Sequence, residues 1–548
     1  MPLQKNQVLT LHIERLSSDG SGVAHSPDGE TVFIPGAAPG DEARVRIVKD
    51  CKRYAFGILD EVLTPSPDRI PVDCAVAGPC GGCSLRHLDY AAELRAKQEN
   101  VADAFARIGG LDVPVLPIVG SPEVNRYRNK VQFPVGVDKS GKPCIGFYAG
   151  RTHRIVPCPD CRLQPGVLNE IGNALCAFFA EKGIQPYSEE TGRGLVRHIF
   201  LRRGAHSGQI MVCLVCTRAK LPSAEELCTR LKAQFAEITT ILLNVNAKNT
   251  NVILGTETHT LYGQGYIEDT LCGVPVQLGP LSFYQVNTLA AEQLYGIAAQ
   301  YAQLTPDDLL LDLYCGMGTI GLSMAAHCRE LIGVEIVPEA IESAKANAAR
   351  MGADVAAKSR FFCADAGQAA TRLAAEGLHP DIVMLDPPRK GCDEATLSAV
   401  VRMSPRRVVY VSCNPATAAR DAAWLEQNGY HAEKVQPVDL FPRTRHVEAV
   451  LLLSKLNVER HIEVDVNMEE LDVTAAESKA TYDQIRDYVW EHYQLKVSNL
   501  YIAQVKQKYG IIERENYHKA KNENAKQPKC PKEKEDAIVE ALKHFQMI

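Results

Sequence analysis

The sequence contains no uninterrupted apolar run of about 18 residues, the length that a membrane-spanning helix needs. Residues 1–5 also lack the apolar core of a signal peptide. We therefore expect a cytoplasmic protein with no membrane partner. An excess of positive charge is missing too, because the formal net charge is −6. An acidic chain binds nucleic acid poorly as a whole, so a nucleic-acid site would have to be a local basic patch.

What the chain does contain is typical of a large globular protein. Its 548 residues are 46% hydrophobic and 23% charged, which indicates roughly three or four folded domains. It also contains 18 cysteines. In a chain without a secretion signal we expect these to be reduced, serving as metal ligands, nucleophiles or small buried side chains.

The pattern of apolar residues changes three times along the chain. Residues 8–63 alternate over five short runs separated by turns, which is typical of a small β-barrel. The next stretch mixes strand-like runs with helices and predicts an α+β domain. From about residue 290, buried strands alternate with helices, which predicts an open, mostly parallel α/β sheet. The last part is polar and helical. The predicted domains are 1–64, 65–280, 281–456 and 457–548.

A glycine-rich turn follows the first buried strand of the predicted α/β sheet. The strand 309–313 contains Asp312 and leads into Gly316-x-Gly318-x-x-Gly321. Glu335, at the end of the next strand, can accept hydrogen bonds from ribose hydroxyls. The glycines alone also fit a dinucleotide site. A later strand ends in Asp386-Pro387-Pro388-Arg389, a stiff loop that suits methyl transfer to a planar base and that hydride transfer does not require.

Two further residues at strand ends are candidates for catalysis. Cys413 follows the buried strand 407–412 and precedes Pro415, where a thiolate would face the methyl donor. Glu448 precedes an apolar run and could act as a general base. The alternatives are a cysteine that only packs and a glutamate that is only solvated.

A cluster of cysteines lies after the predicted barrel. Cys74, Cys80 and Cys83 fall within ten residues of one another, and glycines between them allow a tight fold around a metal. A fourth thiol can come from Cys161 or from Cys158. Thiolate ligands suit zinc or a [4Fe-4S] cluster, and the spacing alone favours neither.

Five motifs, in this order and spacing, resemble the RNA uracil-5-methyltransferase family. The similarity covers about residues 5–455, and the barrel with its cysteine cluster looks most like the 23S rRNA branch. The motifs are Phe283–Asn287, Asp312–Gly316, Asp386–Arg389, Ser412–Pro415 and His446–Glu448.

The resemblance implies a fold and a set of site residues. The barrel would be a TRAM domain, an oligonucleotide-binding fold that binds RNA, and the α/β sheet a Rossmann-like class I methyltransferase domain. The family's nucleophile falls on Cys413 and its base on Glu448. S-adenosyl-L-methionine contacts fall on Gln285, Tyr314, Glu335 and Asp386. Ligands of a [4Fe-4S] cluster fall on Cys74, Cys80, Cys83 and Cys161. Thr319 departs from the asparagine common in relatives, and we leave it out of the site.

The activity implied is methylation of C5 of a flipped uridine by a monomeric enzyme. The resemblance favours 23S rRNA as the substrate. Three alternatives remain. The same chemistry could act on tRNA, the chain could be a non-catalytic iron–sulfur RNA-binding protein, or the Asp-Pro-Pro loop could serve an amino-methyltransferase that needs no nucleophilic cysteine.

Two regions are predicted to contact RNA directly. Residues 126–133 and 195–203 interleave basic and aromatic side chains, which suits phosphate contact and base stacking, and Arg151 and Arg154 extend the patch. In the last domain, helices over 482–490 and 500–510 predict a helix-turn-helix, followed by a lysine-rich loop with Lys519, Lys521, Lys526, Lys529, Lys532 and Lys534. The alternative is a helical packing module.

Overall fold

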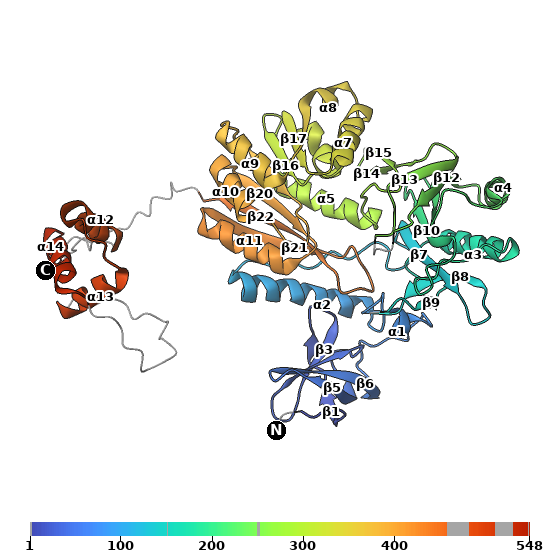
Figure 1. Cartoon of the computed structure of the whole chain (residues 1–548), viewed down its shortest axis with the longest axis horizontal. Coiled ribbons are helices and arrows are strands. Elements are labelled where there is room, and N and C mark those ends of the chain that lie inside the picture. The colour runs from blue at the N-terminus through green and yellow to red at the C-terminus, as the bar shows by residue number, and fades with distance from the viewer. Residues whose placement is uncertain are drawn as a thin grey trace. The chain divides into compact units, whose positions relative to one another are not determined.

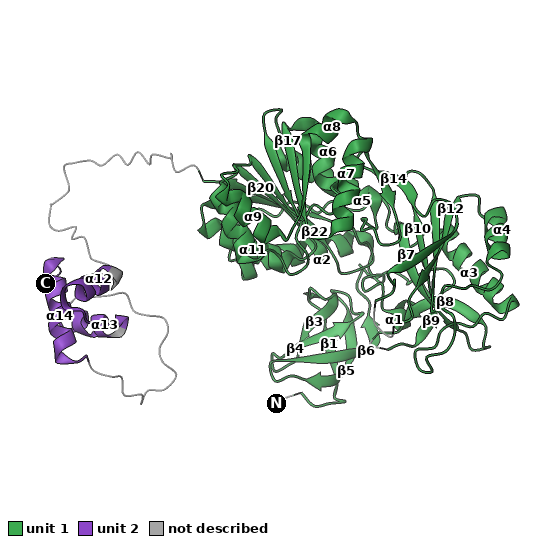
Figure 2. Cartoon of the chain, turned by 45° about the horizontal axis from the view of Figure 1, so that its top comes forward, with its two compact units in different colours: residues 1–457 green, residues 458–548 purple. Residues whose placement is uncertain are grey.

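The computed structural model describes residues 3–150, 152–248, 252–456, 482–509, 530–545 and 547. The chain forms two compact units, residues 1–457 and 458–548, which Figure 2 colours separately. No helix among the described residues is long and apolar enough to cross a membrane.

The N-terminal part of the first unit is a six-stranded sheet with the order β1-β5-β6-β4-β3-β2. Alternate side chains from its strands, among them Val32, Val45 and Ile47, enclose one small core. This agrees with the predicted barrel, and Ser21–His25 is one of its strands. The strands are β1 (Val8–His12), β2 (Arg15–Leu16), β3 (Ser21–His25), β4 (Thr31–Pro35), β5 (Glu42–Asp50) and β6 (Tyr54–Thr64).

A seven-stranded, mostly antiparallel sheet follows, with the order β13-β12-β11-β10-β7-β8-β9. Its middle strands are buried on both faces. One face packs under helices α3 (Gly166–Glu181) and α4 (Ala224–Gln234), and the other packs toward the hairpin β14–β15. The strands are β7 (Lys130–Val137), β8 (Pro143–Tyr148), β9 (Ile155–Pro157), β10 (Val196–Arg203), β11 (Ile210–Cys216), β12 (Ile238–Val245), β13 (Glu257–Tyr262), β14 (Ile267–Leu271) and β15 (Val274–Leu278).

The third part of this unit is the predicted α/β sheet, with the order β18-β17-β16-β19-β20-β22-β21. Its first five strands run parallel, β22 is antiparallel to β20, and the edge strand β21 pairs antiparallel with β22. The strands are β16 (Leu309–Leu313), β17 (Glu330–Glu335), β18 (Ser359–Cys363), β19 (Ile382–Leu385), β20 (Arg407–Ser412), β21 (Tyr430–Val438) and β22 (Glu448–Lys455). The helices are α5 (Thr288–Ala302), α6 (Thr319–Met324), α7 (Pro338–Arg350), α8 (Ala353–Lys358), α9 (Ala366–Ala375), α10 (Glu394–Met403) and α11 (Pro415–Gln427).

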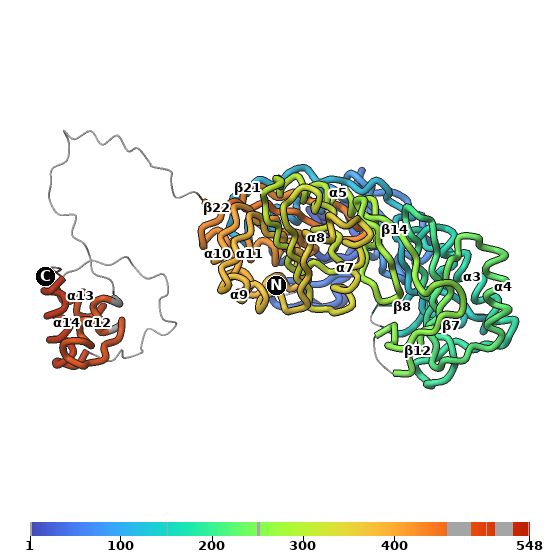
Figure 3. The backbone as a smooth tube through the Cα atoms, turned by 90° about the horizontal axis from the view of Figure 1, so that it is seen from above, coloured from blue at the N-terminus to red at the C-terminus, as the bar shows by residue number. Residues whose placement is uncertain are grey.

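The two large sheets occupy opposite ends of the first unit. In the tube view of Figure 3, α3, α4, β7 and β12 gather at one end, and α9, α10 and β22 gather at the other. One early helix crosses this division. Helix α2 (Tyr90–Asp103), with the π-helical turn Ala104–Gly109, lies along β21 and α11 (Figure 1), and its Val101 and Phe105 belong to the core of the α/β sheet.

The second unit consists of three helices among its described residues. They are α12 (Tyr482–Tyr493), α13 (Asn499–Lys508) and α14 (Lys532–His544). Ser498 caps α13 by accepting a hydrogen bond from the Tyr501 N–H. Ile485, Ile502 and Ile538, one from each helix, meet in a single core.

The two helices predicted for this unit are present, but Lys532 and Lys534 begin α14 instead of belonging to a loop. Lys519, Lys521, Lys526 and Lys529 lie outside the described residues.

Candidate active site

The predicted cofactor residues meet because their strands end at one edge of the α/β sheet. Leu313 pairs with Val334 of β17 and with Leu385 of β19. Tyr314, Glu335 and Asp386 therefore lie next to one another at the carboxyl ends of parallel strands, which is where open α/β sheets bind their ligands.

The predicted nucleophile and base lie on the two strands that follow in this sheet. Ser412 of β20 pairs with Ala449 of β22 in antiparallel register. One step further along the register places Cys413 opposite Glu448. Facing residues of an antiparallel pair have Cα atoms about 4.5–5.5 Å apart. Asn414 then caps α11 by accepting from the Ala416 N–H, so strand and helix both fix the position of Cys413.

Burial favours the protonated form of both of these groups. It raises the pKa of the Cys413 thiol, and the nearby carboxyl of Glu448 raises that pKa further. Burial also raises the pKa of Glu448 well above its usual value, with Asp386 adding to the effect. Arg389 acts in the opposite direction on both groups, because its cation favours the thiolate and the carboxylate.

Arg389 ends the Asp-Pro-Pro motif in the sequence, where no role was predicted for it. Its position directly after the two prolines is the sequence feature that could have indicated a role at the site. The same arginine, after burial, helps to lower the pKa of His446 to about 4.

The glycine-rich turn after β16 has a left-handed backbone conformation at three positions. Tyr314, Gly316 and Gly318 all have positive φ, with values of 64°, 56° and 80°. The carboxylate of Glu335 accepts a hydrogen bond from the Gly316 N–H at 3.1 Å and from the Val337 N–H at 3.0 Å. Glu335 therefore ties the turn after β16 to the end of β17.

Two aspartates at this edge have raised pKa values. Burial raises the pKa of Asp386 to about 7 and that of Asp312 to about 8. Asp312 is fully buried and accepts from the Gly321 N–H at 3.0 Å, while its other oxygen has no partner. A cation bound at this edge would favour the ionised form of both carboxyls. The sequence analysis identified Asp312 as part of a motif but not as an ionisable group of the site.

Gln285, the remaining predicted cofactor residue, lies on the segment that joins the central sheet to the α/β sheet. Asn129 of the central part donates to the Gln285 carbonyl at 2.7 Å. Arg202, which is 1% exposed, donates to the carbonyls of Gly279 and Ser282. These contacts hold the segment that carries Gln285 against the central sheet.

The prediction that residues 195–203 contact RNA is wrong. These residues form the central strand β10, in which Arg197 is 5% exposed and Phe200 is 1% exposed. The Arg197 guanidinium donates to the backbone carbonyls of Asn246 and Lys248. Arg197 and Arg202 therefore satisfy backbone carbonyls inside the protein and do not face a phosphate backbone.

The prediction for residues 126–133 is wrong for its aromatic residues. Tyr127 and Phe133 are 5% and 0% exposed, so neither can stack on a base. Arg126 donates to the carbonyl of Cys161 and forms an ion pair with Asp160. Arg154 is exposed, and Arg151 lies outside the described residues.

The predicted cysteine ligands come from two separate segments that approach each other. Cys80 and Cys83 are both close enough to Cys161 for its charge to raise their pKa, although burial is the larger cause. A hydrogen bond from the Cys158 thiol lowers the pKa of Cys161. Among the residues that the structure describes, no three His, Cys, Asp or Glu side chains are grouped closely enough to hold a metal ion.

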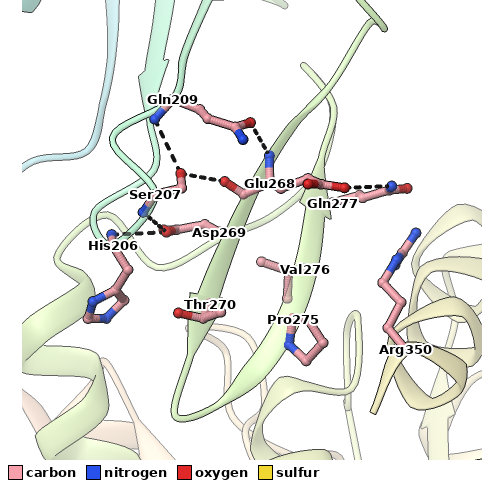
Figure 4. A pocket seen from close by; sticks show the side chains of 10 residues that line it. All are labelled: His206, Ser207, Gln209, Glu268, Asp269, Thr270, Pro275, Val276, Gln277 and Arg350. Atoms are coloured by element: carbon pink, nitrogen blue, oxygen red, sulfur yellow. Dashed lines mark hydrogen bonds between the residues drawn. The ribbon is translucent and has the colours of Figure 1, made fainter. Parts of the chain in front are cut away.

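A separate cavity of about 420 Å³ lies between the hairpin β14–β15 and the end of α7 (Figure 4). Its wall includes Asp269, which accepts hydrogen bonds from the N–H groups of His206 and Ser207. Arg350 closes one side. None of the predicted site residues lines this cavity, so it is distinct from the edge that carries Cys413.

Comparisons with known proteins agree with this geometry. The family model described as tRNA (Uracil-5-)-methyltransferase matches residues 205–456, and the TRAM domain model matches residues 2–59. A protein of Halalkalibacterium halodurans named as an RNA methyltransferase is 43% identical over 457 residues, which make up 83% of this chain and 99% of that protein. One of Listeria monocytogenes is 42% identical over 455 residues, 82% of this chain and 98% of its own.

A solved structure is similar over the same extent. It is the Pyrococcus abyssi tRNA (uracil-54, C5)-methyltransferase in complex with S-adenosyl-L-homocysteine. Its TM-score is 0.65 at 27% identity, and the match covers 82% of this chain and 100% of that one. The N-terminal TRAM domain and the class I methyltransferase fold are thereby confirmed. The relatives, the two family models and the strand-end site agree, and the chain belongs to the RNA uracil-5-methyltransferase family.

Proposed function

We propose that the chain, acting as a monomer, methylates C5 of one uridine in 23S rRNA, with S-adenosyl-L-methionine as methyl donor. The observation that carries this proposal is the antiparallel register that puts Cys413 opposite Glu448, beside Asp386 at the cofactor edge. A packing cysteine would need no buried carboxyl and no arginine next to it.

The residue types fit the chemistry of uracil. C5 of uracil is too weak a nucleophile to take a methyl group from a sulfonium directly. The Cys413 thiolate adds to C6, which turns C5–C4–O4 into an enolate, and C5 then takes the methyl group. Glu448 removes the C5 proton, the C6–S bond breaks by β-elimination, and the thiolate is released.

Four residues are proposed to hold the methyl donor, namely Gln285, Tyr314, Glu335 and Asp386. Glu335 keeps about one lone pair free for a ribose hydroxyl, on Oε2, while its oxygens accept three hydrogen bonds from backbone N–H groups. The half-buried carboxyl of Asp386 lies where a positively charged sulfonium would favour its ionised form. The target base is stacked inside a helix or loop, so it must be flipped out to reach this edge.

The covalent route is tested by replacing Glu448 with Gln. The variant should still add to C6 and transfer the methyl group but remove the C5 proton slowly, so a methylated protein–RNA adduct should accumulate on a denaturing gel. Tritium release from 5-tritiated uridine in the RNA should fall in parallel. If the Gln variant turns over normally, Glu448 is not the base.

The same assay separates the other readings. A non-catalytic RNA-binding protein would release no tritium. An amino-methyltransferase would form no Cys413 adduct with RNA containing 5-fluorouridine.

The same chemistry on tRNA is the second candidate, favoured by the likeness to the Pyrococcus abyssi enzyme, which acts on uracil-54 of tRNA. Mass mapping of 5-methyluridine in 23S rRNA and in tRNA, from cells with and without the gene, decides between the two RNAs. The proposal for 23S rRNA predicts loss of one 5-methyluridine from that RNA alone.

We also propose that Cys74, Cys80, Cys83 and Cys161 hold a [4Fe-4S] cluster. The approach of Cys161 to Cys80 and Cys83 supports this ligand set. The cluster would join two chain segments and lie outside the catalytic edge. Protein purified without air should be brown, with about four irons per chain. Stoichiometric zinc would overturn the assignment, and a coloured Cys161→Ser variant would move the ligand to Cys158.

A further inference from the structure

The loop between β21 and β22 leads directly to Glu448, and other parts of the chain hold it at every step. The four consecutive carbonyls of residues 440–443 each accept a hydrogen bond from a different segment. The donors are Asn287 Nδ2 for Leu440, Lys97 Nζ for Phe441, Tyr127 Oη for Pro442 and the Leu85 N–H for Arg443, at 3.0–3.2 Å.

A buried group of charges stands at the centre of these contacts. Lys97 is completely buried, and its ammonium donates to Glu93 Oε1 and to Asp439 Oδ1, both at 2.7 Å. The bond to Phe441 uses its third hydrogen. Tyr90 donates to the second oxygen of Asp439 at 2.9 Å, and Glu93 also accepts from the Arg443 N–H at 2.7 Å.

This group joins two distant parts of the sequence. Tyr90, Glu93 and Lys97 lie on one face of α2, at intervals of three and four residues. Asp439 follows the last residue of β21. Buried charges of this kind contribute little net stability compared with apolar side chains of the same size. Their more specific effect is to fix one arrangement of the groups that they join.

The fixed segment continues to the proposed base. The Thr444 hydroxyl donates to the Phe441 carbonyl at 2.8 Å, and the His446 N–H donates to that hydroxyl at 3.3 Å. The rings of Phe441 and His446 meet edge to face. Val447 is buried, and Glu448 is next.

We propose that Glu93, Lys97 and Asp439 are positioning residues that hold the loop 439–446 so that Glu448 reaches the C5 proton of the uridine adduct. This inference rests on the proposed role of Glu448. Displacing a general base by about 1 Å slows its step by up to about 100-fold. Cys413 is held separately by β20 and α11, so loosening the loop affects proton removal more than thiolate addition.

The test uses two isosteric variants of the full chain, Asp439→Asn and Glu93→Gln. Each leaves Lys97 with one carboxylate, so both are expected to fold. The matched control is Asp308→Asn, which weakens the ion pair of the buried Asp308 with the exposed Arg406 at the opposite edge of the same sheet.

The measurement is one turnover with the RNA that the wild-type chain methylates. Methylated RNA still attached to protein and free methylated RNA are quantified on a denaturing gel. We expect the ratio of attached to free product to rise on the order of tenfold in Asp439→Asn and Glu93→Gln. In Asp308→Asn the ratio of attached to free methylated RNA should stay unchanged, even if the total amount of methylated RNA falls.

Two failures are distinct. A wild-type chain that forms neither adduct nor 5-methyluridine would overturn the proposed function. An active wild type whose ratio is unchanged in both Asp439→Asn and Glu93→Gln would overturn only the positioning role.

Discussion

The first unit contains two seven-stranded sheets that use polar residues in opposite ways. In the α/β sheet, Asp386 and Cys413 stand one residue beyond the end of a strand, where they face a ligand edge. In the central sheet, Arg197 and Arg202 stand inside β10 and donate to backbone carbonyls. The difference indicates that a polar residue just beyond a strand end is available to a ligand, whereas a polar residue inside a central strand is used to satisfy backbone carbonyls.

The largest effect is expected for Cys413→Ala. Without the thiolate, C5 is not activated, so methylation should fall to background while binding of S-adenosyl-L-homocysteine and the unfolding midpoint stay unchanged. Methyl transfer and urea unfolding measure the two effects. Cys144→Ala, in β8 of the central sheet, is the matched control and should keep full activity. A Cys413→Ala variant that still methylates would remove the contrast between the sheets.

Arg202→Met should show the reverse pattern. Loss of the guanidinium leaves the buried carbonyls of Gly279 and Ser282 without donors, which should cost about 3 kcal/mol of unfolding free energy. Cofactor binding should weaken as well, because Arg202 holds the segment before Gln285 through these carbonyls. Urea unfolding and calorimetry measure both. Arg203→Met, at the half-buried end of β10, is the control and should have the smaller effect. Equal effects in the two variants would contradict the proposed role of Arg202 in holding this segment.

Arg389→Gln should shift the pH dependence of the reaction without reducing stability. Arg389 lowers the pKa of both Cys413 and Glu448, and each must lose its proton to act. Removing the cation raises both pKa values, so the rising limb of kcat/KM should move to higher pH. Arg389→Lys should restore part of the shift. A lower rate with an unchanged pH profile would show that Arg389 acts only on RNA binding.

A smaller effect is expected in cofactor binding itself. Asp386 and Asp312 have pKa values of about 7 and about 8 in the free chain, so both ionise as pH rises through this range. The cationic methyl donor should therefore bind more tightly at pH 8.5 than at pH 6, and neutral S-adenosyl-L-homocysteine should depend less on pH. Calorimetry at several pH values tests this. Equal pH dependence for both ligands would remove the aspartates from the cofactor site.

The smallest effect is expected from truncation after residue 456. The second unit has its own core and none of the strand-end residues, so the single-turnover rate should be unchanged. If the helix-turn-helix prediction holds, RNA binding should weaken by about tenfold or less, and more at raised salt. Filter binding over a salt series measures this. Identical binding at every salt concentration would leave the unit as a packing module.

The sequence predicted the α/β sheet well because buried parallel strands are continuous apolar runs. The ends of these runs made Asp386 and Cys413 candidates, whereas Glu448 was a candidate because it begins an apolar run. The prediction failed for residues 126–133 and 195–203, because a basic and aromatic strand has the same pattern whether it faces RNA or lies inside a sheet. The sequence could not predict the buried ion pair of Lys97 with Asp439, because a lysine on a helix is expected to be solvated until its distant partners are known.

The docking of α2 on β21 and α11 has a consequence for how the chain folds. On the ribosome, α2 emerges more than 300 residues before the strand and helix that cover Val101 and Phe105. Until α11 and β21 are made, this apolar face lacks both of these partners, and the α/β sheet cannot close its core. Such long-range pairing slows folding and prolongs exposure to aggregation. Chains that stop before α11 should therefore be prone to aggregate and should depend on chaperones, although every strand of their barrel has already been made.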